Sequence, residues 1–168
     1  MESRRASRSP AFAWRSETGY AELPGFRHGR VTMELAGRLD AHVRAGDLGR
    51  VLPEVGFKVA SDPDTVRGPD IAFIRRDRLP DPEPAGFPDF APDLVVEVLS
   101  PGDQPGEILA KVADWLSAGA RLVWVVDPLR RVARVYRQDG SETIVTAEAA
   151  LEGEDVLLGF ACPLETIL

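Results

Sequence analysis

The sequence predicts a single α/β domain in which helices pack on a mixed β-sheet. The chain has 168 residues, enough for one domain with a sizeable core. Its composition, 44% apolar and 28% charged, is ordinary for a globular protein. Residues 93–127 have the pattern strand, helix, strand, which forms a parallel crossover in α/β proteins. The strands predicted on either side follow one another as in an antiparallel meander.

The chain begins with a polar, arginine-rich stretch that lacks the apolar segment of a secretory signal. We therefore predict a poorly ordered tail over residues 1–24 and a folded domain over residues 25–168. Residues 30–45 have helical periodicity, and Gly46 and Gly49 follow them. The apolar face of this helix comprises Val31, Leu35, Leu39, His42 and Val43.

The next segments alternate between apolar and polar residues or form short apolar runs. Residues 50–60 predict one strand or a hairpin arm, and residues 70–75 predict a strand. A proline-rich loop is expected over residues 79–92. Residues 94–99 form the most apolar strand in the chain, which suggests burial on both faces.

A second helix is predicted over residues 105–118, with Gly119 as its cap. Residues 121–126 form a further buried strand, and residues 132–137 alternate as an additional strand. Asp139-Gly140 makes the turn after it. The apolar stripe of the second helix comprises Ile108, Leu109, Val112, Trp115 and Leu116, a spacing typical of a helix that lies on a sheet.

Two acidic residues stand in or directly before apolar strands. Glu97 lies between Leu94-Val95-Val96 and Val98-Leu99, and Asp70 precedes Ile71-Ala72-Phe73-Ile74. A carboxylate in such surroundings is costly to bury unless a cation or hydrogen bonds compensate it. Two of them on neighbouring strands would form an oxygen-rich site for a hard divalent metal. The chain contains five Pro-Asp dipeptides, so the one at 69–70 is weak evidence by itself.

Other interpretations of these residues remain open. Glu97 can also form a buried salt bridge, and Lys111 can be a surface lysine at the border of the apolar stripe. Lys111 gains interest because the chain has eighteen arginines and only two lysines. His28 and His42 lack metal-ligand spacing, which favours core or capping roles for both. For Asp93, at the start of a strand, a solvated or capping role is expected.

Composition limits the choice of partners and compartment. The net charge of −7 is unusual for a protein that grips phosphate backbones nonspecifically, so any nucleic acid has to meet a local arginine patch. No apolar run is long enough to span a membrane. The single cysteine, Cys162, excludes an internal disulfide and suits the reducing cytoplasm, which is the expected location.

Several motifs together carry a resemblance to a known family. They are Pro69-Asp70, the segment 92–101 that contains Glu97, then Lys111, Gly119 and Trp124-Val125-Val126-Asp127-Pro128. In this order they resemble the Uma-two family of putative restriction endonucleases, within the PD-(D/E)XK nuclease superfamily. The similarity extends from about residue 26 to residue 168.

The resemblance implies a restriction-endonuclease-like core that binds Mg²⁺ or Mn²⁺ and hydrolyses nucleic acid, most simply DNA. Asp70 and Glu97, with the main-chain carbonyl of Val98, would hold the metal, and Lys111 would assist catalysis. The superfamily usually carries its lysine two residues after the glutamate, where this chain has Leu99. The first helix of the superfamily often adds a glutamate, for which Glu34 is the candidate. Homodimers are common in the superfamily and are implied here by analogy.

Two further functions remain open from the sequence. One is a catalytically inactive binding or assembly module, whose acids would pair with arginines such as Arg121. The other is a metal-dependent hydrolase with a substrate other than nucleic acid. Convergence of Asp70, Glu97 and Lys111 on one solvent-reachable point would support the metal-dependent hydrolase proposal.

Overall fold

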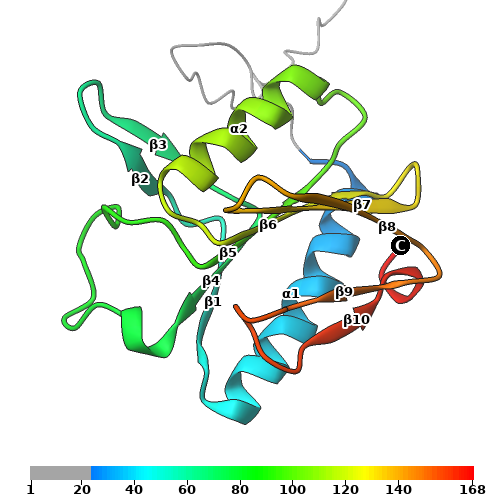
Figure 1. The fold of residues 1–168 in the computed structure, drawn as a ribbon, viewed down its shortest axis with the longest axis horizontal. Helices are drawn as coiled ribbons and strands as arrows, with labels where there is room; N and C mark the ends of the chain where they lie inside the picture. Colours follow the sequence, from blue (N-terminus) through cyan, green and yellow to red (C-terminus); the bar gives the residue numbers. More distant parts are fainter. Residues whose placement is uncertain (1–23) are drawn as a thin grey trace, which may run out of the picture.

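A six-stranded mixed sheet lies between two helices in the computed structural model, which describes residues 24–168 (Figure 1). The predicted tail, apart from Pro24, lies outside the described residues. The helices are α1 (Phe26–Gly46) and α2 (Pro105–Ser117). In their order across the sheet, the strands are β1 (Gly49–Pro53), β4 (Ile71–Arg75), β5 (Leu94–Val98), β6 (Leu122–Asp127), β7 (Val132–Arg137) and β8 (Glu142–Thr146). The predicted fold class is confirmed.

Strand pairing agrees with the predicted crossover. β5 and β6 are parallel, with α2 between them in the chain, and every other pair in the main sheet is antiparallel. The ambiguous segment 50–60 forms two strands, β1 in the main sheet and β2 (Phe57–Ala60) in a separate hairpin with β3 (Thr65–Arg67). The proline-rich loop over residues 79–92 contains no helix or strand, and the short 3-10 helix η1 (Arg76–Arg78) precedes it.

Helix α1 covers one face of the sheet with the apolar residues that its periodicity predicts. Val31, Leu35, Leu39 and Val43 are fully buried. They pack in one cluster with alternate residues of the central strands, among them Phe73. The C-terminal strands β9 (Ala150–Glu152) and β10 (Ala161–Pro163) and the 3-10 helix η2 (Leu164–Thr166) lie on the same side (Figure 1). The helix begins four residues before the predicted start.

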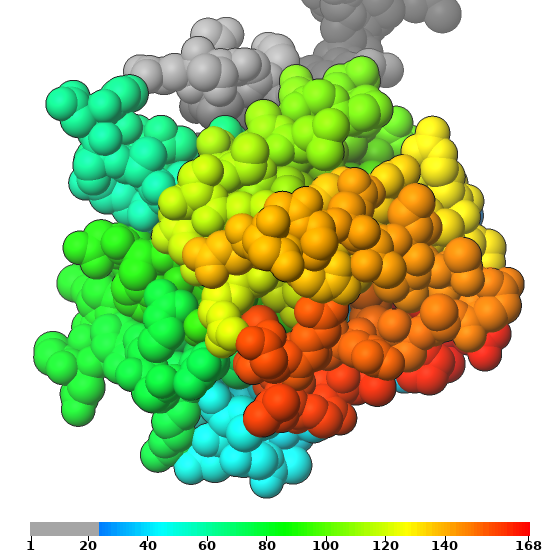
Figure 2. Space-filling model, in the orientation of Figure 1, coloured from blue at the N-terminus to red at the C-terminus, as the bar shows by residue number. Residues whose placement is uncertain are grey.

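Helix α2 covers only part of the opposite face. Its residues Ile108, Val112 and Trp115 are buried against β4, β5 and β6. Leu109, predicted on the same stripe, is 54% exposed, because the helix lies over the centre of the sheet and leaves the β7–β8 side uncovered. In Figure 2 the β8 region, in orange, accordingly lies at the surface beside α2, in yellow-green. Within residues 24–168, neither helix combines the length and the apolar content that a membrane span requires.

The β2–β3 hairpin is connected to α2 by a forked ion pair. Arg67 donates from Nε and Nη2 to one oxygen of Asp114, at 2.9 and 2.6 Å. Phe57 of β2 also packs edge-on against the Trp115 ring. The hairpin therefore contributes to holding the helix in its position over the sheet.

Asp93 is buried, which corrects the expectation that a residue at the start of this strand could be solvated. Its side chain is 1% exposed and lies between two arginines. One carboxylate oxygen accepts the Arg75 main-chain N–H at 2.9 Å, and the other lies 2.8 Å from Arg78 Nη1. The alternative capping role fits the first contact. The last residue of β4 and the 3-10 helix η1 are thus tied to the start of β5 by this carboxylate.

We expect Asp93→Ala to lower the free energy of unfolding by about 1.5–3 kcal/mol, because it leaves a buried N–H and a guanidinium without their acceptor. Chemical denaturation measures the change. Asp77→Ala is the matched control, since Asp77 also pairs with Arg75 but is exposed. Its effect should stay within about 0.5 kcal/mol. Equal losses for the two variants would contradict this account of Asp93.

Candidate functional site

Alternation along β5 directs Glu97 toward α2. Because successive side chains of a strand point to opposite faces, Leu94, Val96 and Val98 pack on the α1 side and Val95 packs on the α2 side. Glu97 shares the parity of Val95, and its side chain meets α2. It is only 6% exposed, within a strand whose other residues are all apolar and buried.

Strand register brings Asp70 next to Glu97. In the antiparallel pair β4–β5, Ile71 is opposite Val96, so the next positions outward on the two strands are Asp70 and Glu97. The Asp70 side chain also links β4 to β5, because its Oδ2 accepts a hydrogen bond from the Val98 main-chain N–H at 2.6 Å. The two acids predicted from the sequence therefore lie on adjacent strand ends.

Two side chains of α2 contact the carboxylate of Glu97. The Trp115 indole Nε1–H donates to Oε1 at 3.0 Å, and Lys111 Nζ lies 3.7 Å from Oε2. Lys111 is 36% exposed, so its ammonium reaches solvent while it faces a buried acid. No arginine of the described chain pairs with Asp70 or Glu97, and Arg121 pairs with Asp155 instead. The pairing with arginines expected of an inactive module is therefore not found among these residues, whose ionisable partners are His28 and Lys111.

Burial raises the pKa of the Glu97 carboxyl above its ordinary value. Lys111 and the Trp115 hydrogen bond favour the ionised form and lower the pKa, whereas the negative charge of Asp70 raises it further. The effect of burial is the largest of these. An ionised Glu97 is thus incompletely compensated by its protein neighbours, and an additional cation would stabilise it.

One cavity of about 760 Å³ is lined by Asp70, Glu97, Val98 and Lys111 together. Its wall also comes from the start of α1, the 68–70 segment, the turn after β5 and the first turns of α2. Three further acids line it that the sequence did not single out, namely Glu54, Asp103 and Glu107. The structure thus brings the predicted trio to one accessible hollow with a strongly acidic wall.

Glu34, the candidate for an additional acid, does not line this cavity. Its side chain is 53% exposed on α1 and lies 3.9 Å from Arg38. Val98 does line the cavity, and its N–H is engaged by Asp70. Glu34 therefore lies outside the cavity that Asp70, Glu97 and Lys111 line.

His28 joins the site although its spacing in the sequence favoured a core or capping role. Its Nε2 lies 3.2 Å from Asp70 Oδ1, its side chain is 11% exposed, and it lines the same cavity. The available signal was the position of His28 at the start of a helix whose apolar face covers the strands. Sequence spacing did not reveal that this helix end meets Asp70.

The carboxylate oxygens of Asp70 and Glu97 are ligands that hard divalent cations prefer, but they come from only two side chains. Within residues 24–168, no cluster of three or more His, Cys, Asp and Glu side chains is arranged to hold a metal ion. Asp70 and Glu97 supply two carboxylates, and each keeps free lone pairs beside the one hydrogen bond that it accepts, from Val98 or Trp115. Such a site fits Mg²⁺, which usually takes one or two carboxylates and keeps several waters.

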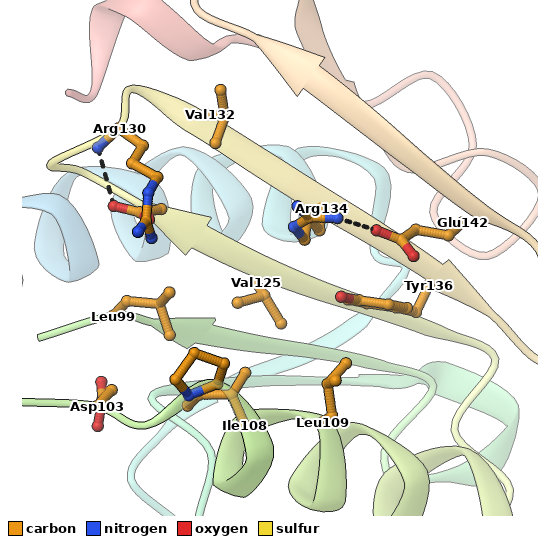
Figure 3. A pocket seen from close by; sticks show the side chains of 12 residues that line it. Leu99, Asp103, Ile108, Leu109, Val125, Arg130, Val132, Arg134, Tyr136 and Glu142 are labelled. Atoms are coloured by element: carbon orange, nitrogen blue, oxygen red, sulfur yellow. Dashed lines mark hydrogen bonds and ion pairs between the residues drawn. The ribbon is translucent and has the colours of Figure 1, made fainter.

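A second groove of about 470 Å³ adjoins this cavity on the uncovered side of the sheet (Figure 3). Leu99, Asp103 and Ile108 line both hollows. The groove is mostly apolar, and its arginines pair with acids, Arg130 with Asp127 and Arg134 with Glu142. It contains neither Asp70 nor Glu97, so the acid chemistry lies in the first cavity.

We expect Glu97→Gln to raise the melting temperature in EDTA at pH 7.5. The pKa of Glu97 is raised in the folded state, so keeping this group ionised destabilises the fold once the pH rises above its ordinary value of 4.5. The difference between wild type and variant should shrink as the pH falls toward 4.5, where Glu97 takes up its proton. Thermal denaturation across this range measures it.

Glu34→Gln is the control for this prediction, because it removes the same charge from an exposed site. Because Glu34 is exposed, this variant should leave the melting temperature at pH 7.5 close to that of the wild type. A Glu97→Gln variant that melts at or below the wild-type temperature at pH 7.5 would contradict the dominance of burial.

Comparison with known proteins agrees with this fold and with the resemblance noted above. A crystal structure of a protein from Anabaena variabilis ATCC 29413, described as a putative nuclease belonging to DUF820, superposes with a TM-score of 0.77 at 20% sequence identity. The match covers 88% of this chain and 83% of that one, and it shows a shared fold. A search of curated proteins finds no match. The family model Uma2, "Putative restriction endonuclease", matches residues 7–165. The chain therefore belongs to the Uma2 family, the Uma-two family of the sequence analysis.

Proposed function

We propose that this protein is a Mg²⁺- or Mn²⁺-dependent endonuclease that hydrolyses phosphodiester bonds, with DNA as its substrate. The observation that carries the proposal is that Asp70, Glu97 and Lys111, far apart in the sequence, line one solvent-reachable cavity. Membership of a family described as restriction endonucleases supports the same reaction class.

In this proposal the cation is held by Asp70 and Glu97, with the main-chain carbonyl of Val98 as a third ligand. The metal would neutralise phosphate charge and lower the pKa of a bound water. Asp70 is prepared for its role because the Val98 N–H holds its carboxylate, and Glu97 because Trp115 fixes one of its oxygens. Both acids are therefore oriented before a ligand arrives.

In addition to the metal, Lys111 contributes a positive charge from the protein itself. Its Nζ is next to Glu97 and partly exposed, so it can approach a phosphate oxygen without leaving the buried acid. There it would orient the scissile phosphate and stabilise the charge that develops on it. Attachment to α2 rather than to β5 places Lys111 across the cavity from the sheet.

Because the wall of the cavity is acidic, the cation would also be needed for nucleic acid to bind there. Glu54, Asp103 and Glu107 repel a polyanionic backbone, and the whole chain carries a net charge of −7. Nucleic acid should therefore approach this site weakly when divalent cations are removed. This requirement for a cation distinguishes the proposed enzyme from proteins that bind nucleic acid through a basic surface.

The purified protein should cleave DNA in the presence of Mg²⁺ or Mn²⁺ and not in EDTA. Asp70→Asn, Glu97→Gln and Lys111→Ala should each reduce the rate at least about 100-fold, since each removes a charge from the reacting region. Gel-based cleavage of labelled single- and double-stranded DNA, with RNA in parallel, measures the activity. Lys58→Ala is the matched control, because the other lysine pairs with Asp64 on the β2–β3 hairpin. Equal cleavage by all variants would identify a contaminant and refute the assignment.

The second candidate is a non-enzymatic binding or assembly module. It is favoured by the contacts that both acids already have within the chain and by the acidic net charge. Calorimetric titration with Mg²⁺ separates the two. The proposed enzyme should give a binding heat that Asp70→Asn abolishes, while Asp77→Asn, at an exposed surface pair, leaves it unchanged. Absence of heat from the wild type would favour the module.

A further inference from the structure

His28, in the first turn of α1, contacts the side chain of Asp70. Its Nε2 is 3.2 Å from Oδ1, while Oδ2 accepts the Val98 N–H. The contact is within ion-pair distance, and because an ionised carboxylate can only accept, a hydrogen bond across it would place a proton on His28 Nε2. The two oxygens of Asp70 are thus each contacted by one nitrogen, the Val98 N–H of β5 and the His28 ring of α1.

The surroundings of His28 point to this contact rather than to packing alone. The side chain is mostly buried, and Nδ1 is buried without a hydrogen-bond partner in the described part of the chain. A histidine placed to satisfy both ring nitrogens would have a second partner. The interaction that the structure does provide is the one with Asp70, at the wall of the cavity.

We propose that His28 is a positioning residue that holds the Asp70 carboxylate ready for a divalent cation. The inference rests on the proposed function, since it concerns the same cation. Each carboxylate oxygen has two lone-pair sites, so Oδ1 can accept from His28 and still face a metal. Hydrogen-bonded partners of this kind fix the orientation of metal ligands, and their loss typically lowers metal affinity about 10–100-fold.

The support for His28 comes from the way α1 packs. Val31 and Leu35, one and two turns further along the helix, are fully buried against the sheet. They fix the start of α1 relative to β4 and β5, and so fix His28 relative to Asp70. Without His28 the Asp70 carboxylate keeps only the Val98 contact and can rotate about it.

His42 offers a matched control on the same helix. Its Nε2 lies 3.0 Å from the main-chain oxygen of Leu158, and its ring packs edge-on against Phe160. It does not line the cavity that contains Asp70. Replacing it tests for general effects of losing a histidine from α1.

The experiment is a titration of the full chain with Mn²⁺, followed by electron paramagnetic resonance of the free ion. We expect His28→Ala to raise the dissociation constant about 10–100-fold. His28→Gln keeps an N–H donor at a similar reach and should recover most of the affinity. His42→Gln should bind as the wild type does. Thermal denaturation of each variant checks that it is folded.

The outcomes separate this inference from the proposed function. If the wild type binds Mn²⁺ and His28→Ala binds it equally well, the positioning role is refuted and the proposed function stands. If the wild type does not bind Mn²⁺, both are refuted. If His28→Gln binds as weakly as His28→Ala while both are folded, the donor role is refuted.

A readout without metal covers the case in which His28→Ala fails to fold. The Val98 amide donates to the carboxylate that His28 also holds, so His28→Gln should preserve the wild-type amide shift of Val98 in a ¹H–¹⁵N spectrum. His28→Leu, which keeps bulk and removes the donor, should move it and speed its hydrogen exchange. An unchanged Val98 amide in His28→Leu would refute the coupling between the two contacts.

Discussion

A carboxyl group buried between a sheet and a helix constrains the central part of this protein. Glu97 stands in a strand that is otherwise apolar, and an acid there requires partners. Trp115 and Lys111 meet it, and both come from α2. Their contacts favour the rotation of that helix that turns both side chains toward Glu97. The same rotation buries Ile108 and Val112, so packing and charge compensation support a single arrangement.

Much of the fold could be predicted from periodicity and from the residues that end each segment. The strand–helix–strand pattern around β5 and β6 required a parallel pair, and the pair is present. The segment 50–60 could not be divided into two strands from its alternation alone, because the break depends on where each half finds a partner. Leu109 shows the limit of the helical stripe, since exposure depends on which strands the helix covers.

The sequence could predict those residues of the candidate site that stand out from their neighbours in the chain. Glu97 interrupts an apolar run, and Lys111 is one of two lysines, so both are visible in the sequence. The proximity of Asp70 to Glu97 depends on the register of β4 against β5, which the sequence does not state. His28 and Trp115 carried signals of core residues, and their polar contacts follow only from the tertiary arrangement.

The ion pair between Arg67 and Asp114 has a consequence for how such a protein can change. Asp114 lies one helical turn beyond Lys111 on α2. The β2–β3 hairpin, whose Arg67 pairs with Asp114, is therefore connected to the helix that carries the lysine. Substitutions in that hairpin can therefore shift α2 and alter the distance between the Lys111 ammonium and the Glu97 carboxylate, even when every residue that lines the cavity is unchanged. Relatives with identical acids and lysine can in this way differ in the geometry of the cavity.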